Sequence, residues 1–137
     1  MIQILYGERG SGKTDRMLEL ANQAGASARG DVVFLSKDNR NMYNVNHTVR
    51  YIDVSAYEAN KPQVFIGLIC GLLAGNFDIE KVFLLSLPSL GGFGCADNME
   101  VFIGQLEHIS SAHNVDFIMS VRGELSAAPQ FFLPYIV

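Results

Sequence analysis

Two kinds of apolar pattern alternate along this chain. Short runs of consecutive apolar residues are typical of buried strands, and longer segments with apolar residues every three or four positions are typical of helices that cover a sheet. The predicted strands span residues 2–6, 31–36, 48–54, 81–87 and 115–121, and the predicted helices span residues 13–25, 61–74 and 98–113. This alternation predicts right-handed βαβ units, and therefore one three-layer α/β/α domain over residues 1–137 with a mostly parallel sheet of about five strands.

The character of each segment predicts its place in the fold. Residues 81–87 are apolar almost throughout, as expected of a central strand, whereas polar residues interrupt residues 48–54 and indicate a position nearer an edge. Gly67 and Gly71 are expected to let the second helix pack closely on the sheet. The apolar tail from Phe131 onwards is expected to dock on the body of the protein or on a second subunit.

Local signals predict where the helices begin and end. Gly25 offers a stop for the first helix, and Asn60 is the expected N-cap of the second. The third helix is preceded by Asp97-x-x-Glu100, which has the spacing of a capping box with Asp97 as the cap.

The first predicted turn carries the strongest chemical signal. Residues 7–14 form an unbroken G-x-x-x-x-G-K-T sequence, the Walker A pattern of P-loop proteins, between a predicted strand and a predicted helix. The motif consists of Gly7, Glu8, Arg9, Gly10, Ser11, Gly12, Lys13 and Thr14. Its glycines permit backbone angles and a close approach that let successive N–H groups point into one concavity, and the N-terminus of the following helix favours an anion there.

The motif predicts a nucleotide site that takes ATP together with Mg²⁺. Lys13 supplies a positive charge for the β- and γ-phosphates, and the Thr14 hydroxyl is a candidate Mg²⁺ ligand. A tight strand-to-helix turn without a ligand is the alternative. Guanine-reading GTPases share an Asn/Thr-Lys-x-Asp loop, but the only Asn-Lys pair of this chain, Asn60-Lys61, is not followed by that Asp. We therefore expect ATP rather than GTP.

The carboxylate that a complete NTPase needs is missing from its usual place. That acid belongs to the Mg²⁺ water shell and usually ends an apolar strand, yet residues 81–87 contain none. Ser86 is a candidate for contacting a metal-bound water, and Asp53 is the best acidic substitute and a candidate metal ligand. The alternative for Ser86 is a buried serine bonded to the backbone, and the alternative for Asp53 is a turn residue at the end of a strand. With Lys13 these are the candidate catalytic residues, and hydrolysis is left open.

Two further groups follow predicted strands. Ser120 and Arg122 come at the end of the last strand, where many P-loop proteins keep a γ-phosphate sensor. Lys37, Asp38 and Arg40 come just after the second strand, and ligands collect at the carboxyl edge of such sheets. This cluster is therefore a candidate acceptor site, with a plain solvated loop as the alternative.

Composition narrows the classes of partner. A net charge of -4 and a pI near 5.2 argue against a broad nucleic-acid surface, which needs clustered Lys and Arg. Cys70 and Cys95 match no metal-ligand spacing and are expected to be reduced, packed thiols. We find no signal peptide, and no apolar stretch reaches the roughly 20 residues of a spanning helix, so a cytoplasmic protein without a membrane span is expected.

Three segments carry a resemblance to a known family. They are Ile-Leu-Tyr-Gly-Glu-Arg-Gly-Ser-Gly-Lys-Thr (residues 4–14), Val-Val-Phe-Leu-Ser-Lys-Asp-Asn-Arg (residues 32–40) and Ile-Glu-Lys-Val (residues 79–82). Together they resemble the P-loop NTPase superfamily, and within it short uncharacterised bacterial ATP-binding proteins labelled as related to the PilT twitching-motility ATPase. The resemblance implies ATP binding, and the chain departs from an intact ATPase at Leu85-Ser86, where an acid is expected. Lys37-x-x-Arg40 is also faintly similar to thymidine-kinase-type enzymes. Those enzymes carry a zinc lasso bound by cysteines, and the two unrelated cysteines of this chain cannot build one.

These observations lead to ranked functional hypotheses. The first is a Mg-ATP-binding P-loop protein, either a slow or degenerate ATPase or a nucleotide-dependent module. The second is a small nucleoside or metabolite kinase, and the third is a scaffold with a vestigial P-loop. The apolar tail adds the expectation of a homo-oligomer.

Overall fold

A computed structural model describes residues 1–87, 90–93 and 96–137, with the side chains of residues 96 and 97 left out. Its strands are β1 (Ile2–Gly7), β2 (Asp31–Ser36), β3 (Val49–Asp53), β4 (Ile79–Leu87) and β5 (Asp116–Arg122). Its α-helices are α1 (Lys13–Ser27), α2 (Pro62–Gly75) and α3 (Ala96–His113), and its short 3-10 helices are η1 (Met42–Asn44), η2 (Val54–Tyr57), η3 (Leu125–Ala127) and η4 (Gln130–Tyr135). The five strands form one all-parallel sheet in the order β1-β5-β4-β2-β3. The predicted α/β class, the central position of β4 and the edge position of β3 are confirmed.

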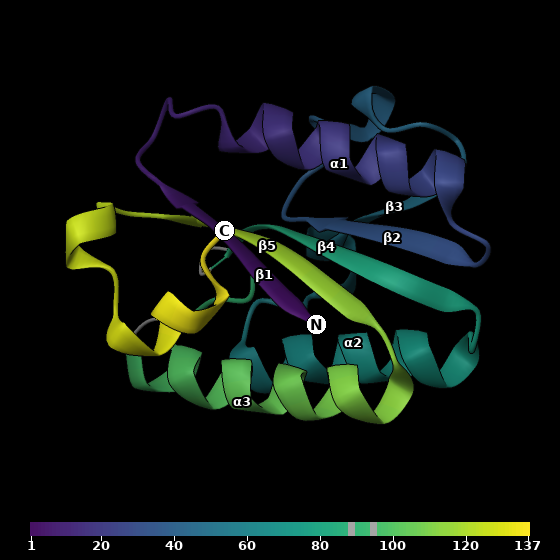
Figure 1. Cartoon of the computed structure of the whole chain (residues 1–137). Helices are drawn as coiled ribbons and strands as arrows, with labels where there is room; N and C mark the ends of the chain where they lie inside the picture. Colours follow the sequence, from purple (N-terminus) through teal and green to yellow (C-terminus); the bar gives the residue numbers. More distant parts are fainter. Residues whose placement is uncertain (88–89, 94–95) are drawn as a thin grey trace.

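Helices cover both faces of the sheet (Figure 1). α1 lies on one face, and α2 and α3 lie together on the other. Each face has its own hydrophobic core, and β4 contributes to both, with Val82 and Leu84 on the α2/α3 side and Phe83 and Leu85 on the α1 side. This two-sided burial explains why the sequence of β4 is an apolar run without alternation.

Three aromatic rings cross the sheet on the α1 side. The strand registers place Tyr51 beside Phe34, and Phe34 beside Phe83. The ring centroid of Phe34 lies 5.6 Å from that of Tyr51 and 6.1 Å from that of Phe83, and the ring planes are nearly parallel. Such cross-strand aromatic pairs stabilise a sheet. They also fix Tyr51 under the loop that follows β2.

The predicted helix ends are wrong at three positions. α1 continues past Gly25 to Ser27, and Gly25 is instead a site of close packing, because a Cβ there would meet Val49 Cγ2 at 2.6 Å. α2 begins at Pro62 with Lys61 as its N-cap and no side-chain cap, so Asn60 is one residue too early. α3 begins at Ala96, which places Asp97 inside the helix and excludes it as the cap.

Two further predictions about α2 are wrong. The helix buries Phe65, Ile69 and Leu73 and turns Gly67 and Gly71 to solvent, where a Cβ would meet nothing within 4 Å. These glycines therefore do not help the helix to approach the sheet. Cys70 lies on the same exposed side and is not a packed thiol. Cys95 lies outside the described residues.

The C-terminal tail packs on its own chain. Phe132 in η4 is buried, and its ring lies 5.9 Å from that of Tyr6. Ile136 bridges Ile4, and the Val137 N–H donates to the Ile4 carbonyl at 3.1 Å. The tail therefore covers the outer edge of β1 (Figure 1), while Leu133 and Val137 stay exposed.

In the described part of the chain, no helix is both long and apolar enough to cross a membrane.

Candidate functional site

The loop of residues 7–14 has the backbone that its glycines predict. Gly10 and Gly12 adopt left-handed angles, with φ of 82° and 85°. Side chains rarely accept this region, because the Cβ crowds the following carbonyl. Gly7 is constrained differently, since a Cβ there would lie 2.9 Å from the Ser11 hydroxyl oxygen. The three glycines therefore serve the shape of the loop.

The loop leads directly into the N-terminus of α1. Gly12 is the N-cap and supplies no side-chain hydrogen bond, and its carbonyl accepts from the Arg16 N–H at 3.0 Å. The first N–H groups of a helix have no partner within the helix. The start of α1 consequently presents donors and the positive end of a helix dipole, which favour an anion.

A cavity of about 400 Å³, here called the loop cavity, opens at this point. It is lined by Arg9, Gly10, Gly12, Lys13, Thr14, Asp15, Ser86, Ser120 and Arg122. Arg122 is brought there by strand pairing, because it lies opposite Gly7 in the register of β1 and β5. The Gly123 N–H also donates to the Gly7 carbonyl at 3.0 Å. Three cationic side chains and one carboxylate thus surround the cavity.

Lys13 shows the electrostatic character of the loop cavity. Its ammonium donates to the Glu8 carbonyl at 2.9 Å and lies 3.5 Å from the Ser11 hydroxyl, so it bends back over the loop. Partial burial, and next the positive charge of Arg122, lower the pKa of Lys13 below its usual value of 10.5. Both causes disfavour a lone cation here, and a bound anion would relieve the repulsion between the two side chains.

Ser86 and Ser120 form the wall opposite the loop. The pairing of β4 with β5 is irregular between Leu84 and Leu87, and Ser86 has a left-handed φ of 63°. The Ser86 N–H donates to the buried Ser120 hydroxyl at 2.8 Å. Ser120 therefore holds the bend at the end of β4, and Ser86 lies at the cavity wall. Unusual backbone angles of this kind cluster at functional sites.

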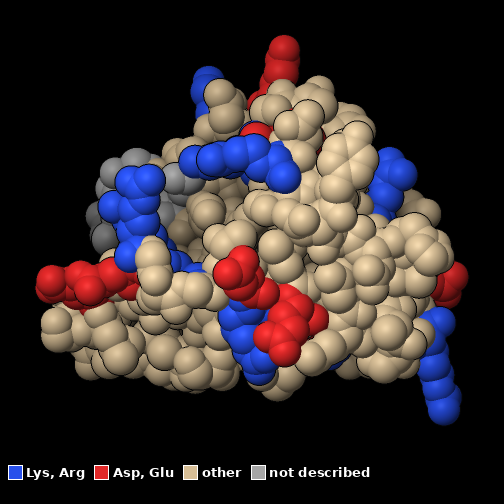
Figure 2. All heavy atoms as spheres, turned by 90° about the horizontal axis from the view of Figure 1, so that it is seen from above, with Lys and Arg blue, Asp and Glu red and all other residues tan. Residues whose placement is uncertain are grey.

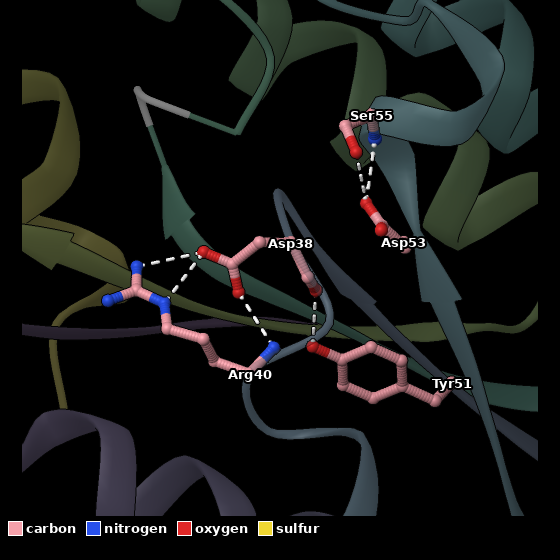
Figure 3. Close-up of polar contacts among 5 residues, drawn as sticks. All are labelled: Asp38, Arg40, Tyr51, Asp53 and Ser55. Atoms are coloured by element: carbon pink, nitrogen blue, oxygen red, sulfur yellow. Dashed lines mark hydrogen bonds and ion pairs between the residues drawn. The ribbon is translucent and has the colours of Figure 1, made fainter.

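Asp53 is not brought to the loop cavity. It ends β3, two strand positions beyond β4, and its carboxylate accepts from the Ser55 N–H at 3.0 Å and the Ser55 hydroxyl at 2.6 Å (Figure 3). It thus begins η2 as a local cap, which agrees with its alternative as a strand-end turn residue. Nothing in its position supports the expected role as a Mg²⁺ ligand or catalytic group.

The Lys37, Asp38 and Arg40 cluster does lie next to the loop. All three residues line a neighbouring cavity of about 270 Å³, here called the Asp38 cavity. Its lining is completed by Thr14, Ser36, Asn41, Leu85 and Ser86. Thr14 and Ser86 therefore belong to both cavities. A third cavity, of about 440 Å³, shares Arg9 and Arg122 with the loop cavity and is otherwise lined by Glu8, Gly123 and Glu124.

Two contributors were missed in the sequence. Asp15 lines the loop cavity, and its position directly after Thr14 was the available signal. Tyr51 donates its hydroxyl to the Asp38 carbonyl at 2.6 Å and so fixes the loop after β2. No local pattern could have indicated Tyr51, because its place follows from the pairing of β2 with β3.

Charges of both signs share the surface on the α1 side. In Figure 2, Lys and Arg side chains lie apart with Asp and Glu side chains among them. Within the described residues, no group of three or more His, Cys, Asp and Glu side chains is placed to hold a metal ion. The loop cavity offers oxygen atoms from the Thr14, Ser86 and Ser120 hydroxyls and from the Asp15 carboxylate.

Comparison with family models and with the sequences of curated proteins finds no match.

Proposed function

We propose that this chain is a P-loop protein that binds Mg-ATP in the loop cavity. The observation that carries the proposal is the left-handed backbone of Gly10 and Gly12 at an N-terminus of α1 that has no side-chain cap. Oriented N–H groups at a helix start form an anion site. Arg9, Lys13 and Arg122 around the same cavity match the several negative charges of a triphosphate.

The donor set fits Mg²⁺ bound together with a nucleotide. Mg²⁺ takes oxygen ligands, keeps several waters and usually relies on few protein groups besides the phosphates. Thr14 and Ser86 both line the loop cavity and the Asp38 cavity, and their hydroxyl groups supply such oxygens. Thr14 is the proposed direct ligand, and Lys13 is the proposed partner of the terminal phosphates.

The all-parallel sheet with helices on both faces fits a single three-layer domain of the P-loop NTPase type. This agrees with the resemblance to short ATP-binding proteins labelled as PilT-related. We propose a slow ATPase or a nucleotide-dependent module as its role. The missing guanine-reading loop favours ATP over GTP.

A small nucleoside or metabolite kinase is the second candidate. One observation favours it, namely that the Asp38 cavity adjoins the loop cavity through Thr14 and Ser86. A molecule in that cavity would therefore lie beside the terminal phosphate. A scaffold with a vestigial loop is the third candidate, and it predicts no nucleotide binding.

Calorimetric titration tests the proposal. Mg-ATP and Mg-GTP are titrated into the wild type, into Lys13→Ala, and into Lys61→Ala as a matched control, because Lys61 is exposed and lies outside the loop cavity. We expect ATP binding in the wild type and in Lys61→Ala, and a loss of binding in Lys13→Ala. A folded wild type that binds neither nucleotide would refute the proposed function.

A further inference from the structure

The Asp38 cavity lies on the side of the loop where a terminal phosphate belongs. In a Walker A loop the Lys and the Ser/Thr face the β- and γ-phosphates. Thr14 lines both the loop cavity and the Asp38 cavity, so a terminal phosphate beside Thr14 would face the Asp38 cavity. Arg9 and Arg122 also line the third cavity, which therefore adjoins the loop cavity.

Asp38 is the only described residue of the Asp38 cavity that carries a carboxylate. Its backbone is fixed by the Tyr51 hydroxyl, which donates to the Asp38 carbonyl at 2.6 Å (Figure 3). Tyr51 is held in turn by its stacked neighbour Phe34. The loop that carries Asp38 is therefore tied to the sheet rather than free in solvent.

Arg40 forms an ion pair with the Asp38 carboxylate in this structure. The guanidinium approaches through Nε at 2.9 Å and through its terminal nitrogen at 2.8 Å, and the Arg40 N–H donates to the other oxygen at 3.1 Å (Figure 3). The Arg40 side chain is 76% exposed and the Asp38 side chain 33%. Exposed ion pairs are weak, so this one opens at little cost.

We propose that Asp38 is the catalytic base of this site. It accepts the proton of an O–H nucleophile that occupies the Asp38 cavity and attacks the terminal phosphate of ATP. Arg40 holds the Asp38 carboxylate until the nucleophile enters. This inference rests on the proposed function.

The step balances in atoms and charge. The nucleophile oxygen forms a bond to the γ-phosphorus, and the bond between the γ-phosphorus and the β–γ bridging oxygen breaks. ADP leaves with that electron pair, and the nucleophile proton passes to the Asp38 carboxylate and then to solvent. With water the products are ADP and phosphate, and with an alcohol they are ADP and a phosphate ester.

The volume of the cavity admits more than water. About 270 Å³ is available, whereas one water occupies about 30 Å³ in the liquid. A small hydroxyl compound therefore fits as well as water does, and the shared chemistry is an O–H group directed at phosphorus. Ser36 and Asn41 provide polar contacts for such a compound.

The experiment compares Asp38→Asn with Arg40→Gln, because both variants break the same ion pair. ADP formation from Mg-ATP is measured for each, alongside Asp53→Asn as a control outside both cavities. General base catalysis contributes about 10²–10⁴-fold. We therefore expect Asp38→Asn to form ADP at least about 100-fold more slowly and Arg40→Gln, which keeps the carboxylate, to be slowed less, while Asp53→Asn stays within about tenfold of the wild type.

Binding and product analysis complete the test. Calorimetry of the wild type and of each variant with Mg-ATP separates the two proposals. A wild type that does not bind Mg-ATP refutes the nucleotide site. If Asp38→Asn still binds Mg-ATP, its slower reaction is assigned to the role of Asp38 as base. ADP and free phosphate are measured with and without glycerol as the probe alcohol. Equal amounts identify water as the nucleophile, an excess of ADP identifies glycerol, and either supports the proposal if the rate depends on Asp38.

Three results would overturn the inference. Asp38→Asn could retain the wild-type rate, or Asp38→Asn and Arg40→Gln could slow the reaction equally, which would make the ion pair merely structural. The third is a wild type that binds Mg-ATP but forms no ADP with either nucleophile. Thermal unfolding of each variant confirms that the compared proteins are folded.

Discussion

Glycine has opposite roles at two places in this chain. Gly12 has a left-handed φ of 85° at the start of α1, whereas Gly67 lies in the interior of α2 with open space around it. A Cβ is strained in the first position and harmless in the second. The two residues therefore form a matched pair for testing the loop backbone.

We expect Gly12→Ala to lower the free energy of unfolding by about 1–2 kcal/mol, the cost of placing a side chain in the left-handed region. We expect Gly67→Ala to raise it by about 0.5–1 kcal/mol, because alanine loses less backbone entropy in a helix. Urea unfolding measures both. A Gly12→Ala variant as stable as the wild type would show that the loop backbone is not constrained as described.

The pKa of Asp38 gives a second test at this scale. The hydrogen bond from the Arg40 guanidinium, with further contributions from the Arg40 N–H and the charges of Arg40 and Lys37, lowers this pKa below its ordinary value of 3.8, and partial burial opposes the shift. The pair therefore stabilises the folded state above pH 3.8, and this contribution is lost as the pH falls through the lower folded-state pKa.

Carboxyl NMR titration of Asp38 in the wild type and in Arg40→Gln measures this effect. We expect the wild-type midpoint to lie below 3.8 and the variant midpoint to move upward. An unchanged Asp38 midpoint would mean that the ion pair does not persist in solution.

Sequence reasoning at the residue scale predicted the backbone of the loop, because its motif determines local geometry. The roles of Gly10 and Gly12 follow from a motif whose backbone is known in advance. Asp53 and Asp38 both follow strands, and the sequence favoured Asp53 as the metal ligand. Asp38 lies beside the loop cavity and Asp53 does not, because β2 is next to β4 and β3 is not, and that information is not local.

At the scale of elements, the C-terminal segment is part of the sheet architecture. η4 places Phe132 against Tyr6, the last side chain before the loop of residues 7–14. Phe132 is 3% exposed, whereas its neighbour Leu133 is 52% exposed. The tail should therefore stabilise β1 through Phe132.

We expect Phe132→Ala to cost about 3–5 kcal/mol, as for other buried aromatic truncations. Leu133→Ala, the control, should change stability by no more than about 0.5 kcal/mol. Urea unfolding followed by circular dichroism measures both variants. Equal effects of the two substitutions would indicate that the tail is not docked on β1.

Strand assignments from the sequence were accurate because each strand contains a short apolar segment, which polar residues interrupt in β3. The helix ends were less accurate for a physical reason. The ends predicted at Gly25 and Asn60 rested on local propensity, while Gly25 is required by the approach of Val49 from a distant strand. Tertiary packing of this kind overrides the local signal.

At the scale of the whole molecule, the proposed nucleotide binding predicts a change in stability. A ligand that binds only the folded state stabilises it by about 2.7 kcal/mol at 100 times its Kd. We expect saturating Mg-ATP to raise the Tm of the wild type by several degrees. Lys13→Ala should show no such shift in differential scanning calorimetry. An equal shift in that variant would place the bound nucleotide elsewhere.

The strand order is the part of the fold that the sequence did not reveal. Alternation of strands and helices predicts a parallel sheet, but many orders satisfy it. The observed order depends on pairings such as that of Ile2 with Phe117, which join distant parts of the chain. The same pairing sets Arg122 beside Gly7, so the composition of the loop cavity could be predicted only in part.

The neighbours of β1 have a consequence for synthesis. β1 leaves the ribosome before β2–β5, but it pairs with β5 on one side and is covered by Ile136 and Val137 on the other. Chains are made from the N-terminus at about 5–20 residues per second. The loop of residues 7–14 must therefore wait for residues 116–137 before its strand is held. A nascent chain can carry the whole Walker A sequence before the residues that complete the loop cavity have been made.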